Sequence, residues 1–182
     1  MSRSLSLRAA ALAIWKAAVE AVDPERLVEG YVRTKGRNLL LGEQILDLDA
    51  VGRIVVVGAG KAGAAMGRGV EEALGDELLE KKQVEGLVNV PADCVVPLQR
   101  ITLHAARPPG ENKPTAAGVE GARRIVSLVR SAGPQDVCLC LLSGGGSALL
   151  PLPVEGVSLE DKQKVTELLH ECGATIHELN AV

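Results

Sequence analysis

The sequence is almost without aromatic side chains. Its 182 residues include one Trp, one Tyr and no Phe, and these two rings are Trp15 and Tyr31. Proteins that bind single-stranded nucleic acid stack bases on aromatic rings, and proteins that bind duplexes need a basic surface. Because the formal net charge is −3, we expect no nucleic-acid partner.

Long apolar segments and metal-ligand clusters are missing too. No run approaches the roughly 18 apolar residues that cross a bilayer, so we expect no membrane partner. The four cysteines form no C-x-x-C pair and the three histidines are scattered, so we expect no metal site built by this chain. Cys138 and Cys140 alternate along an apolar run, and we interpret them as small buried side chains in a reducing, cytoplasmic compartment.

The N-terminal segment predicts helices. Apolar side chains recur at helical spacing from Leu5 to Val22, although two early arginines in an Ala-rich segment leave a mitochondrial presequence as the alternative. Asp23 followed by Pro24 predicts the start of a second, short helix. We expect residues 1–35 to form helices that pack on the domain.

Residues 36–182 alternate apolar runs with helical patterns. We expect an outer strand at 44–50, further strands at 54–57, 84–90, 100–104 and 136–142, and helices that begin near residues 61, 114 and 158. Such alternation implies parallel pairing with right-handed crossovers. The predicted fold class is therefore α/β, a Rossmann-like layered sandwich with a mostly parallel sheet. Because the chain ends within a helical pattern, we expect a truncation before a second domain.

Two strand-to-helix junctions are rich in glycine. They read VVVGAGKAG, residues 55–63, and LLSGGGSAL, residues 141–149. In open α/β sheets a ligand lies beyond the carboxyl ends of the strands, where free amides favour an anion. Glycine lets the main chain approach a phosphate or carboxylate closely. The predicted ligand-binding residues are Gly58, Gly60, Ser143, Gly144, Gly145, Gly146 and Ser147.

Lys61 lies in the first turn of a predicted helix, where the helix dipole disfavours a cation by about 0.3–1 kcal/mol. An ammonium group beside anion-binding amides can neutralise charge on a phosphoryl group during transfer, so we predict that Lys61 is catalytic. The same loop reads G-x-G-x-x-G, which leaves a nicotinamide-dependent reductase as an alternative. However, the next strand ends in Asn89 and Pro91, not in the acidic residue that holds the ribose hydroxyls.

Three segments carry a resemblance to a known family. VVVGAGKAGAAMG, LCLLSGGGSALLPLP and GATIHELNAV, in this order, resemble the glycerate 2-kinases of the MOFRL type, some bacterial members of which are named hydroxypyruvate reductases. The resemblance implies phosphorylation of D-glycerate to 2-phosphoglycerate by ATP with Mg²⁺ or another divalent cation. It also implies a cleft shared with a C-terminal domain that is absent here. It assigns the active-site lysine to Lys61, the second ligand loop to 144–147, and a further site residue to Asn180.

The chain departs from this family after the third strand of the predicted sheet. Members tend to have a Gly-His-Pro-x-Pro-Asp element there, whereas this chain reads ARPPGEN, with Arg107 in the histidine position and Glu111 near the acid. Because half of the cleft is missing, we expect little or no kinase activity from the 182 residues alone.

Several questions stay open at this point. The sequence does not decide which glycine loop takes the nucleotide, which group is the general base, or whether copies of the chain form a homo-oligomer. An NAD(P)-dependent hydroxypyruvate reductase and a truncated form that binds a ligand or partner without catalysis remain alternatives.

Overall fold

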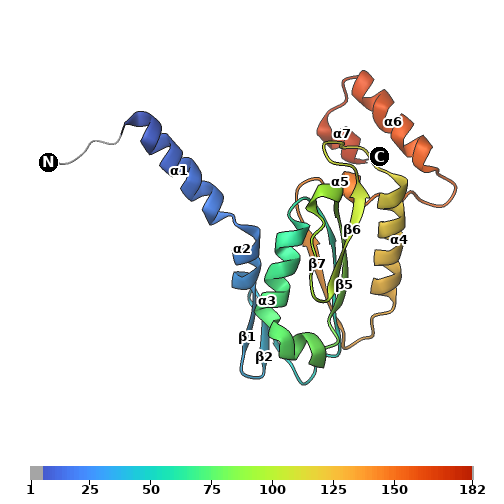
Figure 1. Cartoon of the computed structure of the whole chain (residues 1–182). Coiled ribbons are helices and arrows are strands. Elements are labelled where there is room, and N and C mark those ends of the chain that lie inside the picture. Colours follow the sequence, from blue (N-terminus) through green and yellow to red (C-terminus); the bar gives the residue numbers. More distant parts are fainter. Residues whose placement is uncertain (1–5, 182) are drawn as a thin grey trace.

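The computed structural model describes residues 6–181 (Figure 1). Its helices are α1 (Leu7–Ala21), α2 (Pro24–Tyr31), α3 (Gly63–Lys81), α4 (Ala116–Arg130), α5 (Gly146–Leu149), α6 (Leu159–Glu171) and α7 (Ile176–Ala181). Its strands are β1 (Val32–Lys35), β2 (Asn38–Leu41), β3 (Gln44–Asp47), β4 (Ile54–Ala59), β5 (Glu85–Pro91), β6 (Ile101–Arg107) and β7 (Val137–Leu142). None of the helices in this part of the chain is both long and apolar enough to cross a membrane.

The centre of the molecule is a four-stranded parallel sheet in the order β6-β5-β4-β7. The first three strands add outward in one direction, and β7 then returns to the other side of β4. The strand order therefore reverses between β4 and β7, which is where open α/β sheets bind ligands. The predicted α/β, Rossmann-like fold is confirmed, and the four predicted strands correspond to β4, β5, β6 and β7.

The sheet is covered by helices on both faces (Figure 1). Every residue of β4 is buried, as its β-branched composition predicts for a central parallel strand. Ile54 and Val56 belong to the cluster under α3, whereas Val55 and Val57 pack with Ile125 of α4. Residues at alternate positions of a strand face opposite sides, so β4 joins the two halves of the core.

Gly75 interrupts the helix that follows the first glycine loop. It has φ 70° and a non-helical backbone, but the helix resumes and α3 continues to Lys81. The glycine therefore breaks α3 instead of ending it.

A separate antiparallel sheet, β1-β2-β3, precedes the main sheet. The outer strand expected at 44–50 is β3, and it pairs with β2 instead of joining the parallel sheet. The sequence analysis missed β1 and β2, which are four residues each and turn at Gly36, with φ 59°. The expected boundary at residue 35 falls between these paired strands.

The two N-terminal helices behave differently. Asp23 caps α2 as predicted, because its carboxylate accepts a hydrogen bond of 3.0 Å from the Arg26 amide. α2 packs closely on α3, where a Cβ on Gly69 would lie 2.6 Å from the Glu25 carbonyl oxygen. α1 forms as a helix but buries no residue, and it projects away from the domain (Figure 1). It therefore does not pack on the domain as expected; Leu5 lies outside the described residues.

The expectation that Cys138 and Cys140 are buried is wrong. Both are exposed, although they pair with Val55 and Val57 of β4 and so face the same side of the sheet. The helix on that side, α4, packs over β6, β5 and β4 and leaves β7 uncovered. The alternation in the sequence correctly placed both cysteines on one face of the strand. It could not show how far α4 extends across the sheet.

Candidate functional site

The two glycine loops meet at the carboxyl ends of β4 and β7. The Lys61 amide donates a hydrogen bond of 3.0 Å to the Gly144 carbonyl oxygen, and the Ser143 amide donates one of 3.1 Å to the Ala59 carbonyl oxygen. The Ala62 amide donates to the Ser143 hydroxyl oxygen at 3.0 Å. The structure thus brings together the two loops that the sequence singled out, at the switch point of the sheet.

The first loop has few amides left for a ligand, which differs from the sequence expectation. The Gly60 amide donates to the Asn89 carbonyl oxygen at 3.1 Å, and the Gly63 amide donates to the Gly60 carbonyl oxygen at 3.1 Å. The amides of Lys61 and Ala62 are used by the second loop. An anion at this site would therefore not be held by the main chain of the first loop.

The glycines of the first loop have a packing role in the structure. A Cβ on Gly58 would collide with the Leu141 carbonyl oxygen, and a Cβ on Gly60 would collide with the Ser143 side chain. Gly60 also has a φ of 145°. These two glycines let β4 and its loop lie against β7, which the sequence pattern could not distinguish from a close approach to a ligand.

The second loop does keep free donors. Among the described residues we find no hydrogen bond donated by the amides of Gly144, Gly145, Gly146 or Ser147. Gly145 has φ 89°, a left-handed conformation that suits glycine. The short helix α5 follows directly, and the Ser147 side chain belongs to an exposed residue. Of the two loops, the second is the one that can present its main chain to an anion.

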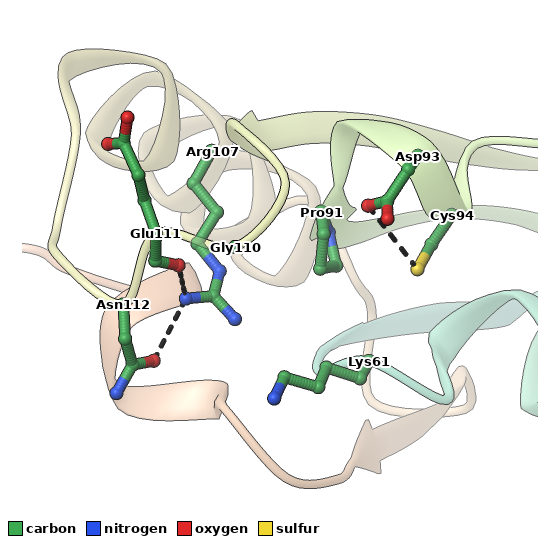
Figure 2. Close-up of a pocket in the computed structure, with 8 residues that line it drawn as sticks. All are labelled: Lys61, Pro91, Asp93, Cys94, Arg107, Gly110, Glu111 and Asn112. Carbon is green, nitrogen blue, oxygen red and sulfur yellow. Dashed lines mark hydrogen bonds between the residues drawn. The ribbon is translucent and has the colours of Figure 1, made fainter.

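Lys61 reaches into a cavity of about 290 Å³ beside the second loop (Figure 2). The residue is exposed, and within residues 6–181 its ammonium group forms no ion pair. A Cβ on Gly145 would lie 3.6 Å from Lys61 Cε, so the lysine passes directly over this loop. The lining also includes Asp93, Cys94, Arg107, Glu111 and Asn112.

Arg107 is a site residue whose contribution the sequence analysis did not predict. It ends β6, and it is only 4% exposed. Its Nη1 donates to the Glu111 carbonyl oxygen and, at 2.8 Å, to Asn112 Oδ1. Its position directly before Pro108 and Pro109, at the end of a strand of the parallel sheet, was the available signal. The structure places Arg107 in the lining of this cavity.

Charged groups around the cavity affect the pKa of Cys94. Burial raises the pKa of its thiol, and the negative charge of Asp93 raises the pKa further. The positive charges of Arg107 and Lys61 act in the opposite direction, toward a lower pKa. Both cations therefore lie near enough to the cavity to affect the same thiol.

The structure does not bring Asn180 to the cavity. The residue is exposed on α7, and it is absent from the cavity lining. Acidic groups close enough to share an ion occur, among the described residues, at Glu25, Glu29 and Glu72, which belong to α2 and α3. At the cavity itself, Asp93 offers a carboxylate. Since Mg²⁺ is typically held by one or two carboxylates together with substrate phosphates, this lining fits a nucleotide-bound cation.

Comparisons with known proteins agree with the resemblance seen in the sequence. A family model described as "Domain of unknown function (DUF4147)" matches residues 10–182. The glycerate 2-kinase of Pyrococcus horikoshii is 32% identical over 179 residues, covering 98% of this chain and 38% of that protein. The D-glycerate 2-kinase of Thermotoga maritima is 35% identical over 177 residues, covering 97% of this chain and 37% of that protein.

A protein of Agrobacterium vitis that carries a hydroxypyruvate reductase name is 42% identical over 132 residues, covering 72% of this chain and 32% of that protein.

Solved structures give the same result. A crystal structure of a Pyrococcus horikoshii protein superposes with a TM-score of 0.80 at 31% identity, covering 98% of this chain and 38% of that one. The crystal structure of the Thermotoga maritima glycerate kinase gives a TM-score of 0.72 at 32% identity, covering 94% of this chain and 36% of that one. This chain spans little more than a third of the length of these relatives. The predicted resemblance to glycerate 2-kinases is confirmed, and the chain belongs to the family described as DUF4147.

Proposed function

We propose that the chain is the N-terminal part of an enzyme that phosphorylates D-glycerate to 2-phosphoglycerate with ATP and a divalent cation. One observation carries this proposal: the Lys61 ammonium group, which forms no ion pair within residues 6–181, lies over a loop whose amides donate no hydrogen bond in the same part of the chain, at the switch point of a parallel sheet. Phosphoryl transfer depends mainly on positioning and on stabilisation of negative charge. The names of the relatives supply the substrate.

Each residue of the site has a separate role in this proposal. The Lys61 ammonium neutralises charge on the transferring phosphoryl group, and the amides of residues 144–147 hold an anionic group of the nucleotide or of glycerate. Asp93 is the carboxylate of this chain that would hold the divalent cation together with the phosphates. When bound, the cation supplies further charge neutralisation at the phosphates.

A nicotinamide-dependent reductase fits the site less well. Dinucleotide-binding folds use the free amides of the first glycine loop for the pyrophosphate and an acidic residue after the second strand for the ribose. Here the amides of Gly60, Lys61 and Ala62 are occupied. Asn89 is buried and donates to the carbonyl oxygens of Gly118 and Leu149, so it does not reach a ribose.

Ligand-dependent thermal unfolding of the 182-residue chain tests the proposal, because a ligand that binds the folded state raises its stability. We expect ATP–Mg²⁺ and D-glycerate to raise the unfolding temperature and NADH to leave it unchanged. Lys61→Met should weaken ATP–Mg²⁺ binding by roughly 10-fold or more, as expected for the loss of a charged contact. Lys81→Met, at the opposite end of α3, is the control and should bind like the wild type.

Two results would count against the proposal. An unchanged affinity for ATP–Mg²⁺ in Lys61→Met would remove the role given to this lysine. A shift with NADH, but none with ATP–Mg²⁺, would favour the reductase.

A further inference from the structure

Arg107 is a buried cation for which residues 6–181 supply no carboxylate partner. Only 4% of the residue is exposed, and among the described residues it forms no ion pair. Its two acceptors, the Glu111 carbonyl oxygen and Asn112 Oδ1, are neutral. A guanidinium removed from water is costly unless an anion compensates it. The part of the chain that the structure describes therefore leaves this positive charge uncompensated.

The carboxylates near the cavity do not supply this compensation. Glu111 offers Arg107 only its carbonyl oxygen, and its carboxylate points away from the guanidinium (Figure 2). Asp93 accepts a hydrogen bond from Cys94 and lies apart from the guanidinium in the same view.

One edge of the guanidinium is anchored and the other is free. Nη1 makes both hydrogen bonds, whereas Nε is buried and has no hydrogen-bond partner in the described part of the chain. A Cβ on Gly145 would lie 3.2 Å from Arg107 Nη2 and 3.6 Å from Lys61 Cε. The missing side chain of Gly145 thus leaves open the space between the two cations, into which both side chains point (Figure 2).

We infer that Arg107 binds the carboxylate of the acid substrate, a small hydroxy acid, in this cavity. The identity of the acid as glycerate rests on the proposed function. The planar fork of a guanidinium matches a carboxylate in a bidentate geometry, and the free Nε–Nη2 edge is such a fork. Arg107 is thereby a substrate-binding and specificity-determining residue.

Size and connectivity favour the carboxylate of the acid over a nucleotide phosphate. The cavity of about 290 Å³ lies just below the usual range of ligand sites, about 300–1,000 Å³, and so suits a three-carbon acid better than a whole nucleoside triphosphate. In a 2-hydroxy acid the hydroxyl group is attached to the carbon next to the carboxylate. Holding the carboxylate at Arg107 therefore keeps the accepting hydroxyl beside Lys61.

Isothermal titration of the 182-residue chain with D-glycerate tests this inference. We expect Arg107→Gln to raise the dissociation constant roughly 10- to 100-fold, the usual range for a lost charge-assisted pair. Arg107→Lys keeps the charge but not the planar fork of donors. Its dissociation constant should lie between those of the wild type and Arg107→Gln. Arg123→Gln, on the exposed side of α4, is the matched control and should bind like the wild type.

A second probe separates this inference from the proposed function. Propionate has the carboxylate without the hydroxyls, so its weaker binding should depend on Arg107 even if the protein does not phosphorylate glycerate. Equal glycerate affinity in the wild type and Arg107→Gln would overturn the inference and leave the kinase proposal intact. Loss of ATP–Mg²⁺ binding with unchanged glycerate binding would overturn it in favour of a nucleotide role.

Unfolding without ligand distinguishes ligand binding from a purely structural role. An uncompensated buried charge costs stability, so Arg107→Gln should unfold at the same temperature as the wild type or higher, while losing the stabilisation by glycerate. Arg107→Gln could instead unfold at a much lower temperature than the wild type and yet retain its glycerate affinity at low temperature. That result would mean that Arg107 only stabilises its loop, and it would overturn the inference. If Arg107→Gln does not fold, Arg107→Lys carries the test with the same criteria. No binding of glycerate or propionate to the wild type would also overturn it.

Discussion

Glycine at four positions of the two loops serves two purposes that only the three-dimensional structure separates. Gly58 and Gly60 have no room for a Cβ, because the opposing strand and Ser143 occupy that space. Gly144 has open space around it, and Gly145 faces the cations of the cavity. Both loops read as glycine-rich turns in the sequence. Which glycine faces a neighbouring strand and which faces a cavity depends on contacts between distant segments.

The left-handed conformation of Gly145 should make this position sensitive to substitution. Gly145→Ala should cost about 1 kcal/mol of stability because of its positive φ, and its methyl group would fill the space beside Arg107 Nη2. We therefore expect both a lower unfolding free energy in urea and weaker glycerate binding. Gly144→Ala meets no atom within 4 Å and should keep the stability of the wild type. Equal stability of the two variants would show that the loop relaxes freely.

Among the helices and strands, Asp136 joins the start of β4 to the turn before β7. Its carboxylate accepts hydrogen bonds from the amides of Gly133 at 2.9 Å and Arg53 at 2.7 Å, and it pairs with the Arg53 guanidinium at 3.1 Å. The Gly133 amide first, then the Arg53 amide and side chain, hold the pKa of Asp136 below its ordinary value of 3.8. These contacts fix the two neighbouring strands at the end opposite to the site.

The pH dependence of this contact can be measured. Because the folded pKa lies below the unfolded one, the Asp136 carboxylate contributes stability above pH 3.8, and the contribution is lost as the pH falls through the folded pKa. Asp136→Asn should therefore lower the unfolding free energy near neutral pH, and the difference from the wild type should shrink in acid. Urea titrations across this range measure the difference. A difference that stays constant with pH would contradict the assignment, and Asp76→Asn, at an exposed position of α3, is the control.

The helix α1 should contribute little to the stability of the chain. Isolated helices of about 12–15 residues are marginal in water, and α1 buries none of its residues. Removal of residues 1–21 should change the unfolding free energy by less than about 0.5 kcal/mol, as for exposed surface changes. Removal of residues 1–31 also deletes α2, with its buried Val28, and should destabilise the chain markedly. Similar losses from both truncations would mean that α1 packs on the domain.

The architecture of the whole molecule could be predicted from the sequence only in part. Continuous β-branched runs such as 54–57 and glycine-rich junctions depend on local composition, so the parallel sheet and the meeting of the two loops could be anticipated. The exposure of Cys140 depends on where α4 ends across the sheet, and the antiparallel pairing of β1 with β2 depends on a short turn. Arg107 needed the structure because its burial, its anchored edge and its free edge are properties of the folded loop.

Catalysis by the 182 residues as a unit depends on how far the site excludes water. Lys61 and Ser147 are exposed, so water reaches the place where the phosphoryl group would be transferred, and electrostatic stabilisation is weak where water has access. We therefore expect the purified chain to bind D-glycerate and ATP–Mg²⁺ but to turn them over little or not at all in a coupled assay for ADP. Robust, Lys61-dependent turnover would contradict this prediction, since it would mean that these residues alone enclose the reacting groups. Absence of binding would instead favour the alternative of a chain that acts through a partner.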